Sequence, residues 1–358
     1  MLVDGINTRS IDYNNDYTVS IIDQTLLPHN LEIKVIKNLD DSIIAIKDMM
    51  VRGAPLIGVT ASYGMTLAIK DNPSDENIYS AFEKLVNTRP TAVDLKWALE
   101  NLMKKILPIN KNDRFDYSWQ LSKSLLEDSV QQCSDIGDHG LNLIKNIKKN
   151  KVNILTHCNA GWLACVDWGT ALAPIYKAYD YGIDVHVWVD ETRPRSQGAS
   201  LTCWELNKHG IPNTLIVDNA GGHLMQKGEV DMCLVGSDRT ASNGDVCNKI
   251  GTYMKALCAF DNNIPFYVAL PESTIDFKLE YGVNNINIEE RSTKEISHIK
   301  GVDNNGNINV VKIIDKDNNI LNPGFDVTPN KYVSKLITNK GVCEASTNGI
   351  KGLFNEKY

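Results

Sequence analysis

The chain has 358 residues and a formal net charge of −7; 42% of its residues are hydrophobic and 23% are charged. This balance is typical of a globular chain with room for about two domains. The negative charge without a Lys/Arg block argues against nucleic-acid binding, and no apolar run approaches the ~18 residues that span a membrane. Eight scattered cysteines without a C-x-x-C pair, and an N-terminus broken by charges, predict a reduced protein of the cytoplasm.

The first half of the chain reads as mainly helical. Two strand-like segments, 18–23 and 31–36, flank Pro28-His29-Asn30 and predict a small β hairpin. Helical periodicity follows to about residue 149, interrupted at residues 51–55. It predicts helices over 38–50, 77–86, 92–106 and 117–149.

From residue 151 onward, short apolar strands alternate with helical segments. The predicted strands cover 152–156, 184–189, 214–217, 232–235 and 265–270, and a helix is expected over 249–260. This alternation predicts a parallel sheet with helices on both faces. A late hairpin is expected from 310–314 and 320–321 around residues 315–319.

A parallel sheet raises the question of a dinucleotide. That interpretation needs G-x-G-x-x-G after the first strand, but the sequence there is Thr156-His-Cys-Asn-Ala-Gly161 and no Gly-x-Gly occurs anywhere. A Walker A pattern is also missing. The sequence therefore argues against a nucleotide cofactor.

Polar residues gather where the predicted strands end. In open α/β sheets these carboxyl ends line the ligand cleft. Cys158 follows the first strand, at a turn into an expected helix, where a thiol is biased toward the thiolate. Asp238 follows the fourth strand, and Asn248 and Lys249 are expected at the start of the next helix. Gln197 carries an amide suited to sugar hydroxyls.

Each of these residues also has a structural interpretation. Cys158 could be a small buried thiol, Asp238 could cap a turn, and Gln197 could cap a loop. His157 is favoured as a structural histidine over a general base. In the first half, Arg52 before Gly53 and Ala54, and Arg89 at a helix boundary, suit phosphate binding, although either arginine could lie at a surface turn.

Taken in order, these motifs resemble the methylthioribose-1-phosphate isomerase family, which shares its fold with the α, β and δ subunits of the translation factor eIF2B. The matching segments cover nearly the whole chain. They include Arg52–Pro55, Asn87–Pro90, Thr156–Asn159, Asp190–Pro194, Gln197-Gly198, Asp218–Gly221, Asp238-Arg239, Asn243–Val246, Asn248–Thr252 and Asn322–Pro329.

The resemblance implies an α/β fold: a mainly helical N-terminal domain with a small β hairpin, placed over 1–136, and a Rossmann-like catalytic domain over 137–358. It implies a homodimer that isomerises an aldose 1-phosphate to a ketose 1-phosphate without metal or organic cofactor. Carried over by position, Cys158 and Asp238 are the catalytic pair. The substrate-binding positions are Arg52, Gly53, Ala54, Arg89, Gln197, Asn248 and Lys249.

Some positions depart from the pattern expected of the family. Ser200 replaces an arginine, Trp162 and Cys165 replace smaller or hydroxyl residues, and Ser237 and Cys247 replace alanines. These changes bear on substrate choice more than on reaction type, because Cys158 and Asp238 are both present.

Three interpretations stay open. The first is isomerisation of 5-methylthioribose 1-phosphate in methylthioadenosine salvage. The second is the same chemistry on 5-deoxyribose 1-phosphate or on ribose 1,5-bisphosphate, which needs a further cation near C5. The third is a non-catalytic regulatory subunit like those of eIF2B, which predicts loss of the catalytic pair.

Overall fold

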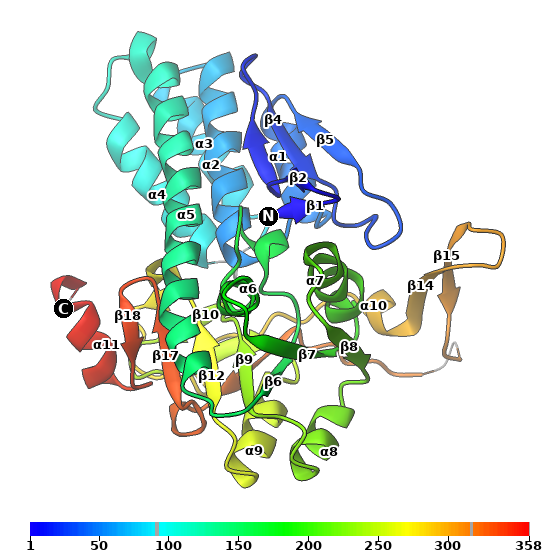
Figure 1. Ribbon diagram of the computed structural model, residues 1–358. Helices are drawn as coiled ribbons and strands as arrows, with labels where there is room; N and C mark the ends of the chain where they lie inside the picture. The colour runs from blue at the N-terminus through cyan, green and yellow to red at the C-terminus, as the bar shows by residue number, and fades with distance from the viewer. Residues whose placement is uncertain (90–92, 316–317, 358) are drawn as a thin grey trace.

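The computed structural model describes residues 1–89, 93–315 and 318–357. Its N-terminal part is a helical bundle beside small antiparallel sheets (Figure 1). The bundle consists of α1 (Leu39–Lys47), α2 (Ala54–Asp71), α3 (Asp75–Val86), α4 (Val93–Ile106) and α5 (Arg114–Lys145). Within the described ranges, no helix is both long and apolar enough to cross a bilayer.

Helix α2 forms the centre of this bundle. Fifteen of its 18 residues are buried, and it packs against α1, α3, α4 and α5. A helix that is buried on all sides has no polar face, so its sequence lacks the 3.6-residue alternation that marks the other helices. This explains why the sequence shows an interruption at 51–55 without delimiting the helix that follows it.

The predicted N-terminal hairpin forms and is larger than expected. Strands β4 (Val19–Ile22) and β5 (Ile33–Ile36) pair antiparallel, and β3 (Ile11–Tyr13) adds a third strand beside β4. A two-residue ladder joins β1 (Leu2–Val3) to β2 (Ile6–Asn7). The inner side chains of the three-stranded sheet, such as Ile11, Val19 and Ile21, join the core of the helical bundle.

The C-terminal part is built on a seven-stranded sheet in the order β18-β17-β12-β9-β6-β7-β8. The strands are β6 (Lys151–Thr156), β7 (Asp184–Asp190), β8 (Asn213–Ile216), β9 (Met232–Val235), β12 (Phe266–Ala269), β17 (Lys335–Thr338) and β18 (Gly341–Cys343). All pairs are parallel except β17 with β18. The first six strands follow the Rossmann order 3-2-1-4-5-6, which reverses direction between β6 and β9. The predicted α/β fold class is confirmed.

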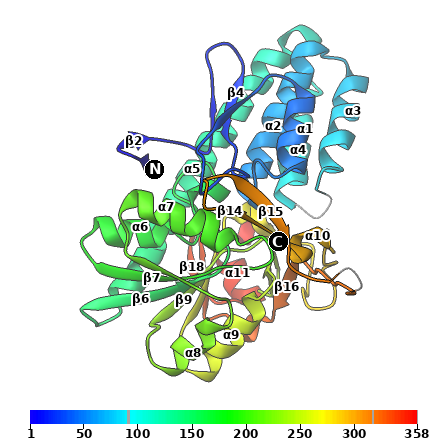
Figure 2. The same cartoon turned by 90° about the vertical axis from the view of Figure 1, so that its right-hand side faces the viewer.

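Helices cover both faces of this sheet. On one face lie α6 (Ala173–Asp180) and α7 (Cys203–His209), toward the helical bundle; α8 (Ala220–Gln226) and α9 (Thr252–Asp261) lie on the other (Figure 2). Alternate side chains of a central strand point to opposite faces of the sheet. Met232 and Leu234 pack on the face covered by α6 and α7, and Cys233 and Val235 pack on the face covered by α8 and α9. This period of two is what a central strand covered on both faces requires. α11 (Thr347–Leu353) follows the edge strand β18.

A second, four-stranded sheet has the order β13-β10-β11-β16. It consists of β10 (Arg239–Ala241), β11 (Val246–Lys249), β13 (Ile275–Asp276) and β16 (Phe325–Thr328). The predicted helix over 249–260 is therefore wrong at its start: Lys249 ends a strand, and α9 begins at Thr252. The central strand β11 is buried along its whole length, because it has neighbours on both edges.

Helix α5 joins the two parts of the molecule. Its first half packs on α2, and its second half packs on α6 and β17. A Cβ at Gly140 would lie 2.4 Å from Pro174 Cγ at the start of α6, so the close approach requires a glycine there. The domain boundary expected after residue 136 falls inside this helix and stays a prediction.

The late hairpin is placed differently from the prediction. Strand β15 (Ile308–Lys312) pairs with the preceding β14 (His298–Val302), not with residues 320–321, which are not in a strand. The turn uses Asn305-Gly306, with Gly306 at φ +83°, a combination that is a strong hairpin signal. Residues 316 and 317 of the expected turn, and Ala92 of the expected fourth helix, lie outside the described residues.

Candidate active site

A pocket opens at the carboxyl ends of β6 and β9 and reaches the N-terminus of α2. Its place in the sheet is the point where the strand order reverses, the usual ligand crevice of this architecture. The nine candidate site residues all line it: Arg52, Gly53, Ala54, Arg89, Cys158, Gln197, Asp238, Asn248 and Lys249. The fold thus brings together residues that are up to 197 positions apart, and their roles stay predictions.

Cys158 lies in a strained turn directly after β6. Its φ is +66°, in the left-handed region that non-glycine residues rarely occupy. Its backbone N–H donates to Thr192 Oγ1 at 2.8 Å, and its thiol donates to Gln197 Oε1 at 3.5 Å. Thr192 is itself at φ +64°. Two strained residues that support each other beside a pocket are typical of functional sites.

The expectation that Cys158 begins a helix is wrong. The chain continues as an irregular turn to the short 3₁₀ segment Trp162–Ala164, whose N-cap is Gly161. The thiol therefore does not lie at the first turn of a helix of its own segment. The cation that faces Cys158 is the Lys249 ammonium, which interacts electrostatically with both Cys158 and Asp238.

Asp238 follows β9, and its backbone N–H donates to the Cys247 carbonyl of β11 at 3.0 Å. Burial raises the pKa of the Asp238 carboxyl above its ordinary value, although the charges of Lys249, Arg52 and Arg89 oppose the shift. A carboxyl with a raised pKa can hold a proton nearer neutral pH, as a general acid must.

Asn248 and Lys249 reach the pocket from the last two positions of β11. The Asn248 amide donates to Thr252 Oγ1 at 3.0 Å. The Lys249 ammonium lies 4.4 Å from the centroid of the Phe325 ring, a favourable cation–π arrangement. Burial lowers the pKa of Lys249, while Cys158 and Asp238 oppose this shift.

The N-terminus of α2 forms another wall of the pocket. Gly53 is the N-cap at φ +90°, and no side chain caps the helix. A Cβ on Gly53 would lie 2.3 Å from the Ala164 carbonyl oxygen, so only glycine fits. Free backbone N–H groups at the positive end of an 18-residue helix favour an anion.

Arg52, next to this helix end, is held by Asn159. One guanidinium nitrogen donates to Asn159 Oδ1 and another to the Asn159 carbonyl oxygen, both at 2.6 Å. The Asn159 amide in turn donates to the Glu205 carboxylate, which also accepts from Trp162 N–H at 2.8 Å and Tyr176 OH at 2.9 Å. Glu205 is fully buried, and burial raises its pKa to about 7. It therefore acts on Arg52 through Asn159 and was not singled out by the sequence.

Gly161→Ala tests how tightly this carboxylate is held. The added Cβ would lie 2.1 to 2.3 Å from three atoms of the Glu205 carboxylate, while the backbone φ of −93° is one that alanine adopts. We expect the free energy of unfolding, measured in urea, to fall by about 1–3 kcal/mol through overpacking.

Gly301→Ala is the matched control, since its Cβ would meet no atom within 4 Å and a change within about 0.5 kcal/mol is expected. Equal free energies of unfolding for the two variants would show that the Glu205 side chain moves aside without cost.

Arg89 approaches from the loop after α3. A guanidinium nitrogen lies 3.7 Å from Glu289 Oε2, and Nε is buried without a hydrogen-bond partner among the described residues. A buried donor without a partner is costly, so a ligand that accepts its hydrogen bond is favoured at this position.

The pocket also includes residues that the sequence interpretation missed. Met49 lies at its edge in the left-handed region at φ +60°, and Arg195, Thr170 and Phe325 line the wall. Arg195 is paired with Glu295 at 3.1 Å. In the sequence, Phe325 could have been identified as a pocket residue from its place in the matching segment Asn322–Pro329. Its residue type gives no such signal, because aromatic residues lie more often in the core than in a binding site.

Four of the five positions that depart from the family pattern separate into two groups. Cys165 and Ser237 line the pocket, whereas Trp162 is 1% exposed and packs against Trp204 in the core. Ser200 lies in the helical turn Gly198–Thr202, donates to the Ser196 carbonyl at 2.9 Å and lines an adjoining cavity. Cys165, Ser237 and Ser200 are thus placed to affect specificity, and Trp162 is placed to affect packing.

A Rossmann-ordered sheet whose switch-point pocket combines a thiol, a carboxyl and several cations defines an α/β protein with a pocket suited to a small anion. The chain belongs to the Initiation factor 2 subunit family, whose family model matches residues 50–345.

Relatives within the family include both enzymes and translation factors. The chain is 53% identical over 361 residues to a methylthioribose-1-phosphate isomerase of Paramagnetospirillum magneticum, with both chains fully covered. The crystal structure of 5-methylthioribose 1-phosphate isomerase from Pyrococcus horikoshii OT3 superposes with a TM-score of 0.85 at 36% identity, covering 98% of this chain and 96% of that one. The structure of translation initiation factor eIF-2B, subunit delta, from A. fulgidus gives a TM-score of 0.80 at 35% identity, covering 98% of this chain and 100% of that one.

Proposed function

We propose that this protein is an intramolecular aldose–ketose isomerase that converts 5-methylthioribose 1-phosphate to 5-methylthioribulose 1-phosphate. The observation that carries the proposal is the convergence of Cys158 and Asp238 on one pocket with the cations Arg52, Arg89 and Lys249. Relatives named for this activity are more than half identical over the whole chain.

The pocket suits a sugar whose phosphate lies on the anomeric carbon. Such a furanose cannot open as a free hemiacetal, so an acid must protonate the ring oxygen as its bond to C1 breaks. Asp238, whose pKa is raised by burial, is the acid in this proposal. A hydrogen must then move from C2 to C1, and the C2 hydroxyl must lose its proton to leave the ketone.

Cys158 is the candidate group at C2, either as the base that removes the hydrogen as a proton or as the group that stabilises charge while it moves as a hydride. The two routes differ in solvent exchange, because deuterium from the solvent enters C1 only when the hydrogen leaves as a proton. Arg52, Arg89, Lys249 and the N–H groups of α2 hold the phosphate.

Phosphorus NMR of the purified protein with 5-methylthioribose 1-phosphate, without added metal or nucleotide, tests the proposal. We expect a ketose 1-phosphate signal without release of free phosphate. The same experiment with 5-deoxyribose 1-phosphate and ribose 1,5-bisphosphate compares the alternative substrates. No turnover of any of the three sugars would favour the non-catalytic subunit, the alternative to which the neighbour named translation initiation factor eIF-2B, subunit delta, points.

We further propose that the protein works as a homodimer in the cytoplasm, with a small sugar 1-phosphate as its partner and without nucleic acid or membrane. The net charge of −7 supports the part of this proposal that concerns nucleic acid. Light scattering on the eluting peak of a gel-filtration column measures the mass and so decides between one and two chains.

Arg89→Ala is expected to raise KM by about 10- to 100-fold with kcat nearly unchanged. A hydrogen bond to a charged group contributes about 1.5–3 kcal/mol, and a phosphate contact is made in the ground state and the transition state alike. Steady-state kinetics measure the split. Arg9→Ala, which removes a surface ion pair with Glu127, is the control, and a lower kcat with unchanged KM in Arg89→Ala would contradict the role.

A further inference from the structure

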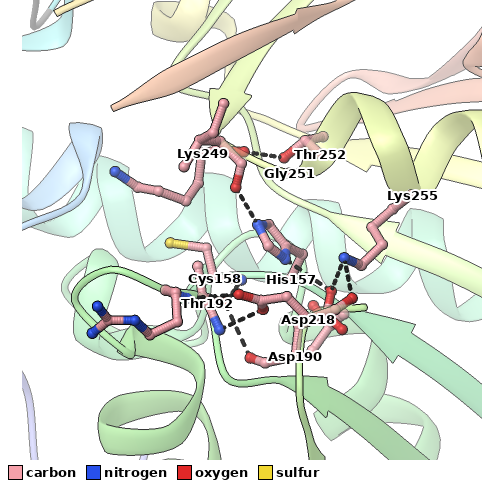
Figure 3. A network of polar contacts seen from close by, with 12 residues as sticks. His157, Cys158, Asp190, Thr192, Asp218, Lys249, Gly251, Thr252 and Lys255 are labelled. Carbon is pink, nitrogen blue, oxygen red and sulfur yellow. Dashed lines mark hydrogen bonds and ion pairs between the residues drawn. The ribbon is translucent and has the colours of Figure 1, made fainter. Parts of the chain in front are cut away.

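The ring of His157 lies on the opposite side of the chain from the Cys158 thiol. In Figure 3 the thiol and the Lys249 ammonium point to one side, and the His157 ring points away from them, toward Asp190 and Lys255. The side chain is 1% exposed. The proposed chemistry uses Cys158 and leaves the buried ring of its neighbour without a role.

Both ring nitrogens of His157 face groups that only accept hydrogen bonds. Nδ1 lies 2.8 Å from Asp190 Oδ2, and Nε2 lies 2.8 Å from the Ile250 carbonyl oxygen. The same Asp190 oxygen is 3.1 Å from the Lys255 ammonium, with which it forms an ion pair. A neutral imidazole has one N–H, so only the doubly protonated ring can donate to both acceptors.

The charges around the ring favour this state. Asp190 ends β7, Lys255 lies on α9, Asp326 lies on β16, and the Asp218 carboxylate accepts the backbone N–H groups of Thr192 and Arg193. Asp326 accepts the N–H groups of Gly251 and Tyr253 and interacts with the ring and with Lys255. One ammonium among three carboxylates leaves an excess of negative charge, which a protonated ring reduces.

The cluster of His157, Asp190 and Asp218 also has the spacing of a metal site. However, the Lys255 ammonium contacts the Asp190 carboxylate at 3.1 Å and the Asp218 carbonyl at 2.6 Å, so it holds the place of a cation. A ring that donates through both nitrogens has no lone pair for a metal. The geometry therefore favours a fixed imidazolium over a metal ligand.

The hydrogen bond to the Ile250 carbonyl connects the segment that carries Cys158 to the segment that carries Lys249. His157 directly precedes Cys158, and Ile250 directly follows Lys249. Gly251, which follows Ile250, is at φ +101°, and a Cβ there would lie 3.0 Å from ring atom Cε1. The ring thus occupies the whole gap between the two segments, and its length sets their separation.

We propose that His157 is a positioning residue: a ring that donates from both nitrogens and joins the segment carrying Cys158 to the segment carrying Lys249. The kinetic consequence rests on the proposed isomerase function, whereas the charge of the ring does not. Loss of the bridge is expected to lower kcat by up to about 100-fold, since an error of 1 Å in the position of catalytic groups can cost that much.

Solid-state ¹⁵N NMR of the full-length protein labelled at the ring nitrogens of its seven histidines tests the charge. We expect one ring with both nitrogens protonated from pH 6.5 to 8.5, and its signals should vanish in His157→Gln. If that variant does not fold, the wild-type spectra still decide, because the absence of any doubly protonated ring at pH 8.5 overturns the proposal.

Kinetics of His157→Gln, Lys249→Met and the double variant test the positioning. Glutamine keeps a donor for one acceptor and carries no charge. If His157 acts through Lys249, the double variant should be no slower than Lys249→Met alone, whereas independent effects multiply. His223→Gln, at an exposed position on α8, is the control and should match the wild type.

The two proposals fail in different ways. If the wild-type protein shows no turnover, the proposed isomerase function is wrong. The NMR result then still decides the charge of His157. If the wild type turns over substrate and the effects of His157→Gln and Lys249→Met on kcat multiply in the double variant, the proposed bridge between Cys158 and Lys249 is wrong. The proposed isomerase function is then unaffected.

Discussion

Replacing Asp238 by asparagine is expected to lower kcat by about 10²–10⁴-fold, the contribution of a positioned acid or base. The amide keeps the size of the side chain and cannot give up a proton to the ring oxygen. The loss of a negative charge beside Arg52, Arg89 and Lys249 leaves the phosphate site more positive, so substrate binding should be retained. Turnover is followed by phosphorus NMR and binding by calorimetry.

Asp261→Asn is the matched control, because Asp261 is an exposed carboxylate at the end of α9, away from the pocket. It should leave both quantities unchanged. Turnover of Asp238→Asn close to that of the wild type would remove this residue from the mechanism, whatever the affinity.

Cys158→Ser should also lower kcat by about 10²–10⁴-fold with little change in KM. The hydroxyl occupies nearly the same space and can still donate to Gln197 Oε1, which accepts from the thiol at 3.5 Å. It is far less acidic than a thiol, however, so it supplies almost no anion near neutral pH. Kinetics and urea unfolding of the same preparations separate a chemical defect from a structural one.

Cys258→Ser, at a half-buried cysteine outside the pocket, controls for the general effect of exchanging sulfur for oxygen. A Cys158→Ser variant with a tenth or more of the wild-type kcat would exclude an essential thiol and leave Asp238 as the single acid–base group.

The parallel sheet was predictable from the sequence because each strand is a short apolar run with polar residues at its end. The segments 152–156 and 232–235 coincide with β6 and β9 to within one residue. Placing Cys158 and Asp238 just beyond two such strands was enough to predict that they meet, since parallel strands end at the same edge.

Three local predictions were wrong, the first two because neighbours distant in sequence decide the conformation and the third because a nearby turn signal was overlooked. Lys249 ends a strand, not a helix start, because β10 and β16 flank β11. Cys158 begins no helix, because its turn is held by Thr192. Strand β15 pairs backward with β14, where Asn305-Gly306 supplies the tighter turn.

The sequence by itself determined the class of fold, the order of the central strands and the short set of chemically capable side chains near their ends. These properties depend on hydrophobic period and on residue type, which are local. Only the tertiary structure decided that Glu205 supports Arg52 through Asn159 and that both His157 nitrogens face acceptors. Hydrogen bonds between buried groups depend on distances of a few tenths of an ångström between segments far apart in the chain, and no local pattern records them.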